Sequence, residues 1–113
     1  MIDQKHQELI DKLISGTSLK KLNWERTDRE TEFKLVVGSS TVTTDNWSLE
    51  NGIDCVDMGI LNKNGEVIDR IAFENNDRER KDYTELLRLY TAAKQSYFRV
   101  DEAFSEIMSH LDY

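Results

Sequence analysis

The sequence predicts an α+β fold: a helix, then about five mainly antiparallel strands, then two helices, with the helices packed on one face of the sheet. Three observations support this prediction. Apolar residues recur at three- and four-residue spacing near both ends of the chain, which is typical of amphipathic helices. Apolar and polar residues alternate through the middle of the chain, which is typical of strands with one buried face. Asn64-Gly65 supplies the positive φ angles of a tight hairpin turn.

The first helix is expected at about residues 3–15. Asp3 is its candidate N-cap, and Gly16 can adopt the left-handed conformation that ends a helix. Its apolar stripe consists of Ile2, His6, Leu9, Ile10, Leu13 and Ile14. We expect the sheet to bury this stripe, with Leu9 and Leu13 in the core.

Two further helices are expected after the strands, at about residues 80–97 and from Asp101, as N-cap, to about residue 111. Asp82 begins a sequence that resembles a capping box for the earlier of the two. Their stripes are Tyr83, Leu86, Leu87, Tyr90, Ala93 and Tyr97, and then Ala103, Phe104, Ile107, Met108 and Leu111. Because every helix has an apolar face to bury, all three are expected to cover the sheet, with Leu87 and Tyr90 in the core.

The strands are expected near residues 21–27, 31–37, 40–47, 53–62 and 66–73. The last two form a hairpin around Asn64-Gly65, whose register is open between two alternatives. A two-residue loop pairs Lys63 with Glu66, whereas a type I turn with a bulge at Gly65 pairs Asn62 with Glu66. The choice determines which side chains face the core.

With 113 residues, the chain is expected to form one domain, 1–113. Its acidic residues are concentrated in the strand-rich middle. Residues 45–77 hold eight acids against two bases, a net charge of −6 out of −7 for the whole chain. A local acidic field favours cationic partners and repels phosphate backbones. We therefore expect a basic protein as the partner and no binding to nucleic acid.

The candidate partner surface combines one aromatic residue with four acids: Trp47, Asp45, Asp54, Asp57 and Asp69. Tryptophan is enriched at the centres of interfaces. Trp47 lies near the end of an expected strand, where it can be partly exposed. Trp24, by contrast, is expected to pack in the core.

Motifs for catalysis and for metal binding are weak. A calcium loop needs oxygen ligands at alternating positions around a glycine, whereas Asp54 and Asp57 lie three apart and point to opposite faces of a strand. Cys55, the single cysteine, cannot form an internal disulfide and is expected to be a buried, unreactive thiol. His6 and His110 both occupy positions with a structural explanation. We expect no catalytic residue, no cofactor and no metal site.

No apolar run approaches the roughly 18 residues that a membrane span needs. The chain start lacks the charged and then apolar pattern of a secretory signal. A soluble, cytoplasmic protein without membrane contact is therefore expected.

Two classes of function remain open. The leading hypothesis is a non-enzymatic protein-interaction domain that uses the acidic strand region, as an inhibitor or antitoxin-like protein or as a regulatory subunit. The alternative is a small-molecule-binding protein or small enzyme with a pocket between sheet and helices. A closed apolar core favours the first, and a cavity lined by convergent polar groups favours the second. In either case, a homo-oligomer can form through an open sheet edge or the last helix.

Four short motifs together resemble a class of small bacterial α+β proteins for which no activity is known. They are Gly16-Thr17, Leu22-Asn23-Trp24-Glu25-Arg26-Thr27, Asn64-Gly65-Glu66-Val67-Ile68 and Val100-Asp101-Glu102-Ala103. Where such proteins tend to have a glycine just before Val-Asp-Glu, this chain has Arg99. The resemblance implies a bacterial, cytoplasmic protein and brings no activity with it.

Overall fold

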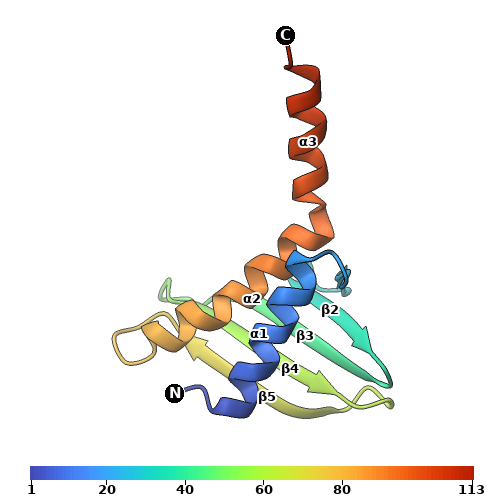
Figure 1. The fold of residues 1–113 in the computed structure, drawn as a ribbon. Coiled ribbons are helices and arrows are strands. Elements are labelled where there is room, and N and C mark those ends of the chain that lie inside the picture. Colours follow the sequence, from blue (N-terminus) through green and yellow to red (C-terminus); the bar gives the residue numbers. More distant parts are fainter.

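The computed structural model describes all residues, 1–113, and confirms the predicted α+β order (Figure 1). The elements are α1 (Gln4–Ser18), β1 (Glu25–Arg26), β2 (Glu32–Val37), β3 (Ser40–Ser48), β4 (Asp54–Leu61), β5 (Val67–Glu74), α2 (Arg80–Phe98) and α3 (Val100–His110). The strands form one antiparallel sheet in the order β1-β2-β3-β4-β5. Helices α1 and α2 lie on one face of this sheet, and α3 projects from the body.

Helix α1 begins as predicted and ends later than predicted. The Asp3 carboxylate accepts a hydrogen bond from the His6 backbone N–H at 2.9 Å, so Asp3 is the N-cap. The prediction that Gly16 ends the helix is wrong, because the left-handed residue is Lys20, with φ 61°. Gly16 instead makes room for Leu22, since a Cβ at position 16 would lie 2.6 Å from Leu22 Cδ1.

The turn of the β4–β5 hairpin is bulged at Gly65. The Asn62 backbone N–H donates to the Glu66 carbonyl oxygen at 3.0 Å, and Leu61 pairs with Val67. Gly65 has a φ of 81°, which a residue with a Cβ rarely adopts. The Asn62 side chain also accepts the Glu66 backbone N–H at 3.0 Å, which holds the turn. The type I turn with a bulge at Gly65 therefore forms at the tip of the hairpin. A second irregularity between Ile60 and Leu61 shifts the pairing by one residue, so from Ile60 and Asp69 onward the strands follow the register of the two-residue-loop alternative.

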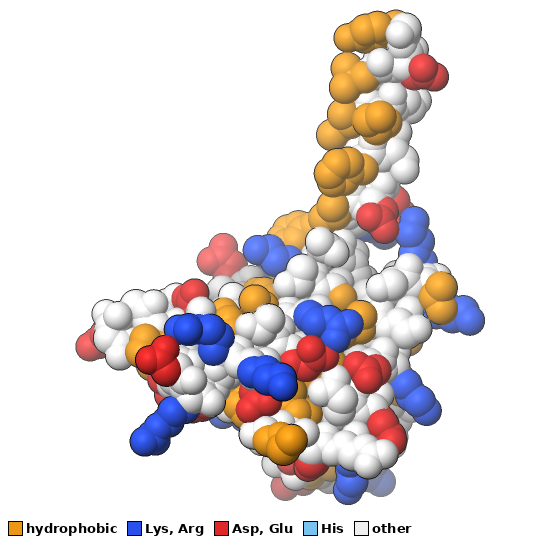
Figure 2. Space-filling view, turned by 60° about the vertical axis from the view of Figure 1, so that its left-hand side comes forward, with side chains coloured by type: hydrophobic (Ala, Val, Ile, Leu, Met, Phe, Trp, Pro, Cys, Tyr) orange, Lys and Arg blue, Asp and Glu red, His pale blue; other side chains and the backbone are white.

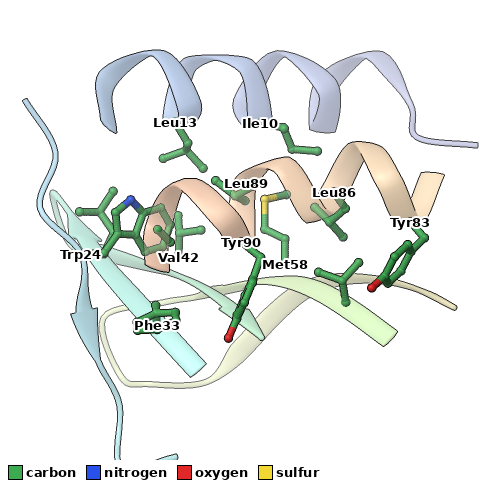
Figure 3. Close-up of a cluster of buried hydrophobic side chains, with 13 residues drawn as sticks. Ile10, Leu13, Trp24, Phe33, Val42, Met58, Tyr83, Leu86, Leu89 and Tyr90 are labelled. Carbon is green, nitrogen blue, oxygen red and sulfur yellow. The ribbon is translucent and has the colours of Figure 1, made fainter. Parts of the chain in front are cut away.

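The hydrophobic core lies between the sheet and its two covering helices (Figure 3). Its thirteen buried side chains are Ile10, Leu13, Trp24, Phe33, Leu35, Val42, Val56, Met58, Tyr83, Leu86, Leu89, Tyr90 and Ala93. The polar groups of Trp24 and Tyr90 in this core form hydrogen bonds. Trp24 Nε1 donates to Thr17 Oγ1, and the Tyr90 hydroxyl donates to the Thr31 carbonyl oxygen, both at 2.9 Å. The core is thus closed without an unpaired tryptophan or tyrosine donor at these positions.

The predicted core residues are buried to different degrees. Leu13 and Tyr90 are buried, whereas Leu9 and Leu87 are half-buried and pack against the edge of the core. Leu89, which the predicted stripe omitted, is completely buried. The inner face of α2 is therefore turned slightly from the predicted one.

The predicted caps of the last two helices are wrong. Helix α2 begins at Arg80 with Glu79 as its N-cap, and α3 begins at Val100 directly after Arg99. Asp82 and Asp101 consequently lie inside the first turn of their helices. A carboxylate there stabilises the positive end of the helix dipole without making a capping hydrogen bond.

Helix α3 does not cover the sheet, contrary to the expectation for all three helices. None of its residues is buried, and it stands away from the body as an arm (Figure 1). The reason is the junction with α2, where Arg99 alone separates the two helices and has left-handed angles, φ 52° and ψ 49°. Figure 2 shows hydrophobic side chains along one side of this arm.

Adjacent leucines of α2 provide a matched test of the core. Leu86→Ala is expected to lower the free energy of unfolding by about 2–5 kcal/mol, because it leaves a cavity among completely buried side chains. Leu87→Ala removes a half-buried side chain and is expected to cost less, below about 2 kcal/mol. Urea denaturation of both variants measures the difference. An equal loss for both would contradict the observed phase of α2.

Candidate functional site

The sheet has one face that no helix covers, here called the free face. Side chains alternate along a strand, and directly paired residues point to the same side. Asp45 pairs with Asp57, and Trp47 pairs with Cys55, so these four residues share the free face. Arg70 pairs with Gly59, two residues from Asp57, and so lies on the same face.

Arg70 connects an acid to the tryptophan. Its guanidinium contacts Asp57 Oδ2 through both Nε and Nη2, each at 2.9 Å. The same guanidinium lies over the Trp47 ring, with Cζ 5.7 Å from the ring centroid. Cation–π contact and the ion pair therefore fix both side chains in one arrangement. Trp47 itself remains half-exposed.

Asp45 is compensated by a cation from a neighbouring loop. Arg29, between β1 and β2, places Nη2 2.5 Å from Asp45 Oδ2. Asp45 Oδ1 accepts the Asn46 backbone N–H at 2.8 Å. Oδ2 accepts no hydrogen bond, so the charge of Arg29 is its main compensation.

Both acids are buried although no helix lies above them. The Asp45 side chain is 1% exposed and that of Asp57 is 9% exposed. Burial raises the pKa of Asp57 above its ordinary value, and the nearby charge of Asp45 adds to this effect. The hydrogen bond and charge of Arg70 oppose the rise and favour the ionised form. Asp57 also accepts the Asp45 backbone N–H at 3.0 Å.

The structure separates the other two acids of the candidate surface from this cluster. Asp54 is exposed at the start of β4, where Ser48 Oγ donates to it at 2.5 Å. Asp69 lies on the helix-covered face, because it pairs with Ile60. Of the five predicted residues, only Trp47, Asp45 and Asp57 therefore share the free face.

Asp69 instead ties α1 to β5 through a histidine. His6 Nε2 lies 2.6 Å from Asp69 Oδ2, and His6 Nδ1 lies 2.7 Å from Asp3 Oδ1. Because both carboxylates accept hydrogen bonds from the His6 ring, the pKa of His6 is raised. In return, the backbone and side-chain hydrogen bonds of His6 lower the pKa of Asp3.

Cys55 is buried, as predicted, beside Trp47. Only 3% of the residue is exposed. Burial raises the pKa of its thiol, and the charges of Glu74 and Asp54 raise it further. A protonated thiol is a poor nucleophile, so the geometry offers no activation of this cysteine.

Sequence reasoning did not identify Arg29 and Arg70 as members of the cluster. Arg70 becomes visible only once the hairpin register is known, because the bulge decides which β5 residues reach the face of Asp57. Arg29 comes from an irregular loop, for which the alternation of a strand gives no direction.

No cavity of appreciable size lies at the centre of the sheet–helix interface, which the core fills. A hollow of about 570 Å³ lies instead where α1 ends and α2 meets α3, and polar residues dominate its lining, among them Lys20, Asn23, Gln95 and Arg99. No group of three or more His, Cys, Asp or Glu side chains is placed to hold a metal ion. None of the helices combines the length and the apolar character required to cross a membrane.

Comparison with protein-family models, with curated proteins and with solved structures found no match to this chain.

Arg70→Met is expected to lower the free energy of unfolding by about 1–3 kcal/mol at pH 7, because buried Asp57 loses its cation. The folded-state pKa of Asp57 is already raised, and losing Arg70 raises it further. The folded protein then binds a proton more readily than the unfolded chain, so the deficit should shrink as the pH falls toward 4.

Chemical denaturation at several pH values measures this deficit. Lys34→Met, which removes a cation without an ion pair from the same face, is the matched control. Adding Asp57→Asn to Arg70→Met should recover part of the loss. A deficit independent of pH, or no recovery, would show that Arg70 does not compensate Asp57.

His6 should make stability depend on pH near neutrality. Its folded-state pKa is raised above the ordinary value of 6.5. The stabilisation is therefore complete below about pH 6.5 and is lost as the pH rises through the folded-state pKa. One proton limits the slope to about 1.4 kcal/mol per pH unit. Denaturation of wild type and His6→Gln between pH 5 and 9 measures it, and an identical slope in both proteins would contradict the assignment.

Proposed function

We propose that this chain is a non-enzymatic protein-interaction domain that binds its partner through the free face, with Trp47 as the central contact. The observation that carries the proposal is the Trp47–Arg70–Asp57 arrangement. It holds a half-exposed tryptophan in place on a sheet face that no helix covers. Tryptophan and arginine are the residue types most enriched among energetically dominant interface contacts. A side chain already held in position loses little conformational entropy on binding.

The charges around Trp47 support a basic partner. Asp45 and Asp57 are already neutralised by arginines, so they cannot supply the attraction. Glu74 pairs with Cys55 across the strands and so lies at the Trp47 end of the free face. Its carboxylate favours a positively charged protein surface. Inhibition of a basic enzyme, as by an antitoxin, or a regulatory subunit are the concrete forms of this function.

Small-molecule binding is the second candidate, and the hollow of about 570 Å³ favours it. Its size is within the range of ligand pockets. It lies at the junction of the helices, however, and not between sheet and helices. Its residues do not overlap with those of the free face, so the two candidates can be tested separately.

Trp47→Ala should weaken partner binding by roughly 30-fold, the effect of losing a contact worth about 2 kcal/mol. The full chain is immobilised and exposed to a lysate of the source organism, and the protein captured is then titrated in purified form. Tyr113→Ala, which removes an exposed aromatic ring far from the free face, is the control and should bind normally. Binding should weaken as salt is added.

Two results would contradict the proposal. One is equal affinity of Trp47→Ala and wild type for the captured protein. The other is the absence of any captured protein, together with a stabilising small molecule whose effect is abolished by Ser96→Trp in the hollow at the helix junction.

A further inference from the structure

Helix α3 exposes an apolar stripe that its own chain leaves uncovered. Phe104, Ile107, Met108 and Leu111 lie three or four residues apart, and each is more than half exposed. In Figure 2 hydrophobic side chains run along one side of the projecting arm. An isolated helix of eleven residues is marginally stable in water. The stripe therefore requires a cover that also stabilises the helix.

The arm cannot turn back onto its own α2. Two antiparallel helices need a connection of about two to five residues, whereas only Arg99 separates α2 from α3. Its left-handed angles direct the arm away from the body. Any groove that receives the stripe must therefore belong to another molecule.

The flank of α2 beside β3 offers such a groove, here called the α2 groove. It has a volume of about 480 Å³ and extends from Asn46 of β3 to the root of the arm. Its apolar surface comes from Leu87, Tyr90, Phe98 and Val100. Thr91 lines this groove and also lines a second hollow, of about 400 Å³, on the α1 side of α2. Lys94, at the rim of the groove, has no ion-pair partner in the structure.

Charge identifies the arm and the groove as complementary. Residues 100–113 contain four acids and neither lysine nor arginine; the acids are Asp101, Glu102, Glu106 and Asp112. The α2 groove presents Lys94, whose charge is not paired, whereas Arg88 in the adjoining hollow pairs with Glu85. Pairing one arm with another arm would bring like charges together, whereas an arm in the groove brings opposite charges together. The chain thus carries both halves of one contact.

We propose that two copies of this chain form a dimer in which the arm of each copy packs its apolar stripe into the α2 groove of the other. Symmetry doubles the contact, because each copy contributes both an arm and a groove. A single short helix in a groove covers less than the about 800 Å² per partner of a standard interface. Two reciprocal contacts bring the buried area toward that value.

The first test is the mass of the full chain in solution. Sedimentation equilibrium of the wild type at about 100 μM should give twice the monomer mass of 13.2 kDa. Ile107→Asp in the stripe and Thr91→Glu in the groove should each weaken the dimer at least tenfold. Ser109→Asp introduces the same charge on the opposite side of the arm and should leave the dimer intact. All three positions are exposed and lie in α3 or on α2, so circular dichroism should report an unchanged body.

Mixing the two defective variants distinguishes arm exchange from pairing of the arms. Ile107→Asp retains an intact groove, and Thr91→Glu retains an intact arm. Their mixture can form one intact arm–groove contact, so a heterodimer should appear that neither variant forms alone. Pairing of two arms would not be restored by mixing.

Three outcomes would overturn the proposal. They are a wild type that stays monomeric at 100 μM, a dimer that survives Ile107→Asp, and a mixture that associates no more strongly than either variant alone. A wild type that stays monomeric and whose arm binds a different protein would also overturn the proposal. This inference does not depend on the proposed function, because loss of the dimer and loss of Trp47-dependent binding are measured on different variants.

Discussion

The contact between the inner side of α2 and the middle of the sheet determines the rest of this structure. Leu86 and Leu89 are completely buried there, together with Val56 of β4. Helix α1 packs mainly on α2, so its position follows from that of α2. The end of α2 likewise determines where the arm leaves the body. The sheet is covered on this side only, and its other face must therefore satisfy its charges without a helix.

The need to compensate charges on the uncovered face explains why Arg29 and Arg70 lie beside its aspartates. Two neighbouring aspartates on adjacent strands repel each other, and burial adds a desolvation cost. A hydrophobic pair would stabilise the sheet at least as well. The ion pairs instead give a defined geometry, since the Arg70 guanidinium that neutralises Asp57 also lies over the Trp47 ring. Charge compensation and the presentation of the tryptophan are thus the same structural feature.

Local patterns predicted the fold, and long-range contacts explain where they failed. The helical stripes, the alternation of the strands and Asn64-Gly65 are local signals, and each led to the correct element. Gly16 was misassigned because its role is to accommodate Leu22, a contact that no local pattern encodes. The grouping of Asp69 with Asp57 did not anticipate the register shift between Ile60 and Leu61, which pairs Asp69 with Ile60 and places it on the side of His6. The amphipathic pattern of α3 indicated that its apolar stripe needs a cover. The pattern does not indicate whether the same chain supplies that cover.

The conformation of Arg99 sets the direction of the arm relative to the free face. A non-glycine residue in the left-handed conformation costs roughly 1 kcal/mol, and a glycine there would allow α3 many directions. With arginine the junction favours the one direction seen here, away from both the sheet and α2. The arm and the α2 groove belong to the helical side of the molecule, whereas Trp47 lies on the opposite face of the sheet. A dimer built through the arms therefore leaves both free faces open. Two such faces on one particle would bind a repetitive or dimeric basic partner with a raised effective concentration, so self-association would strengthen partner binding without adding any contact to it.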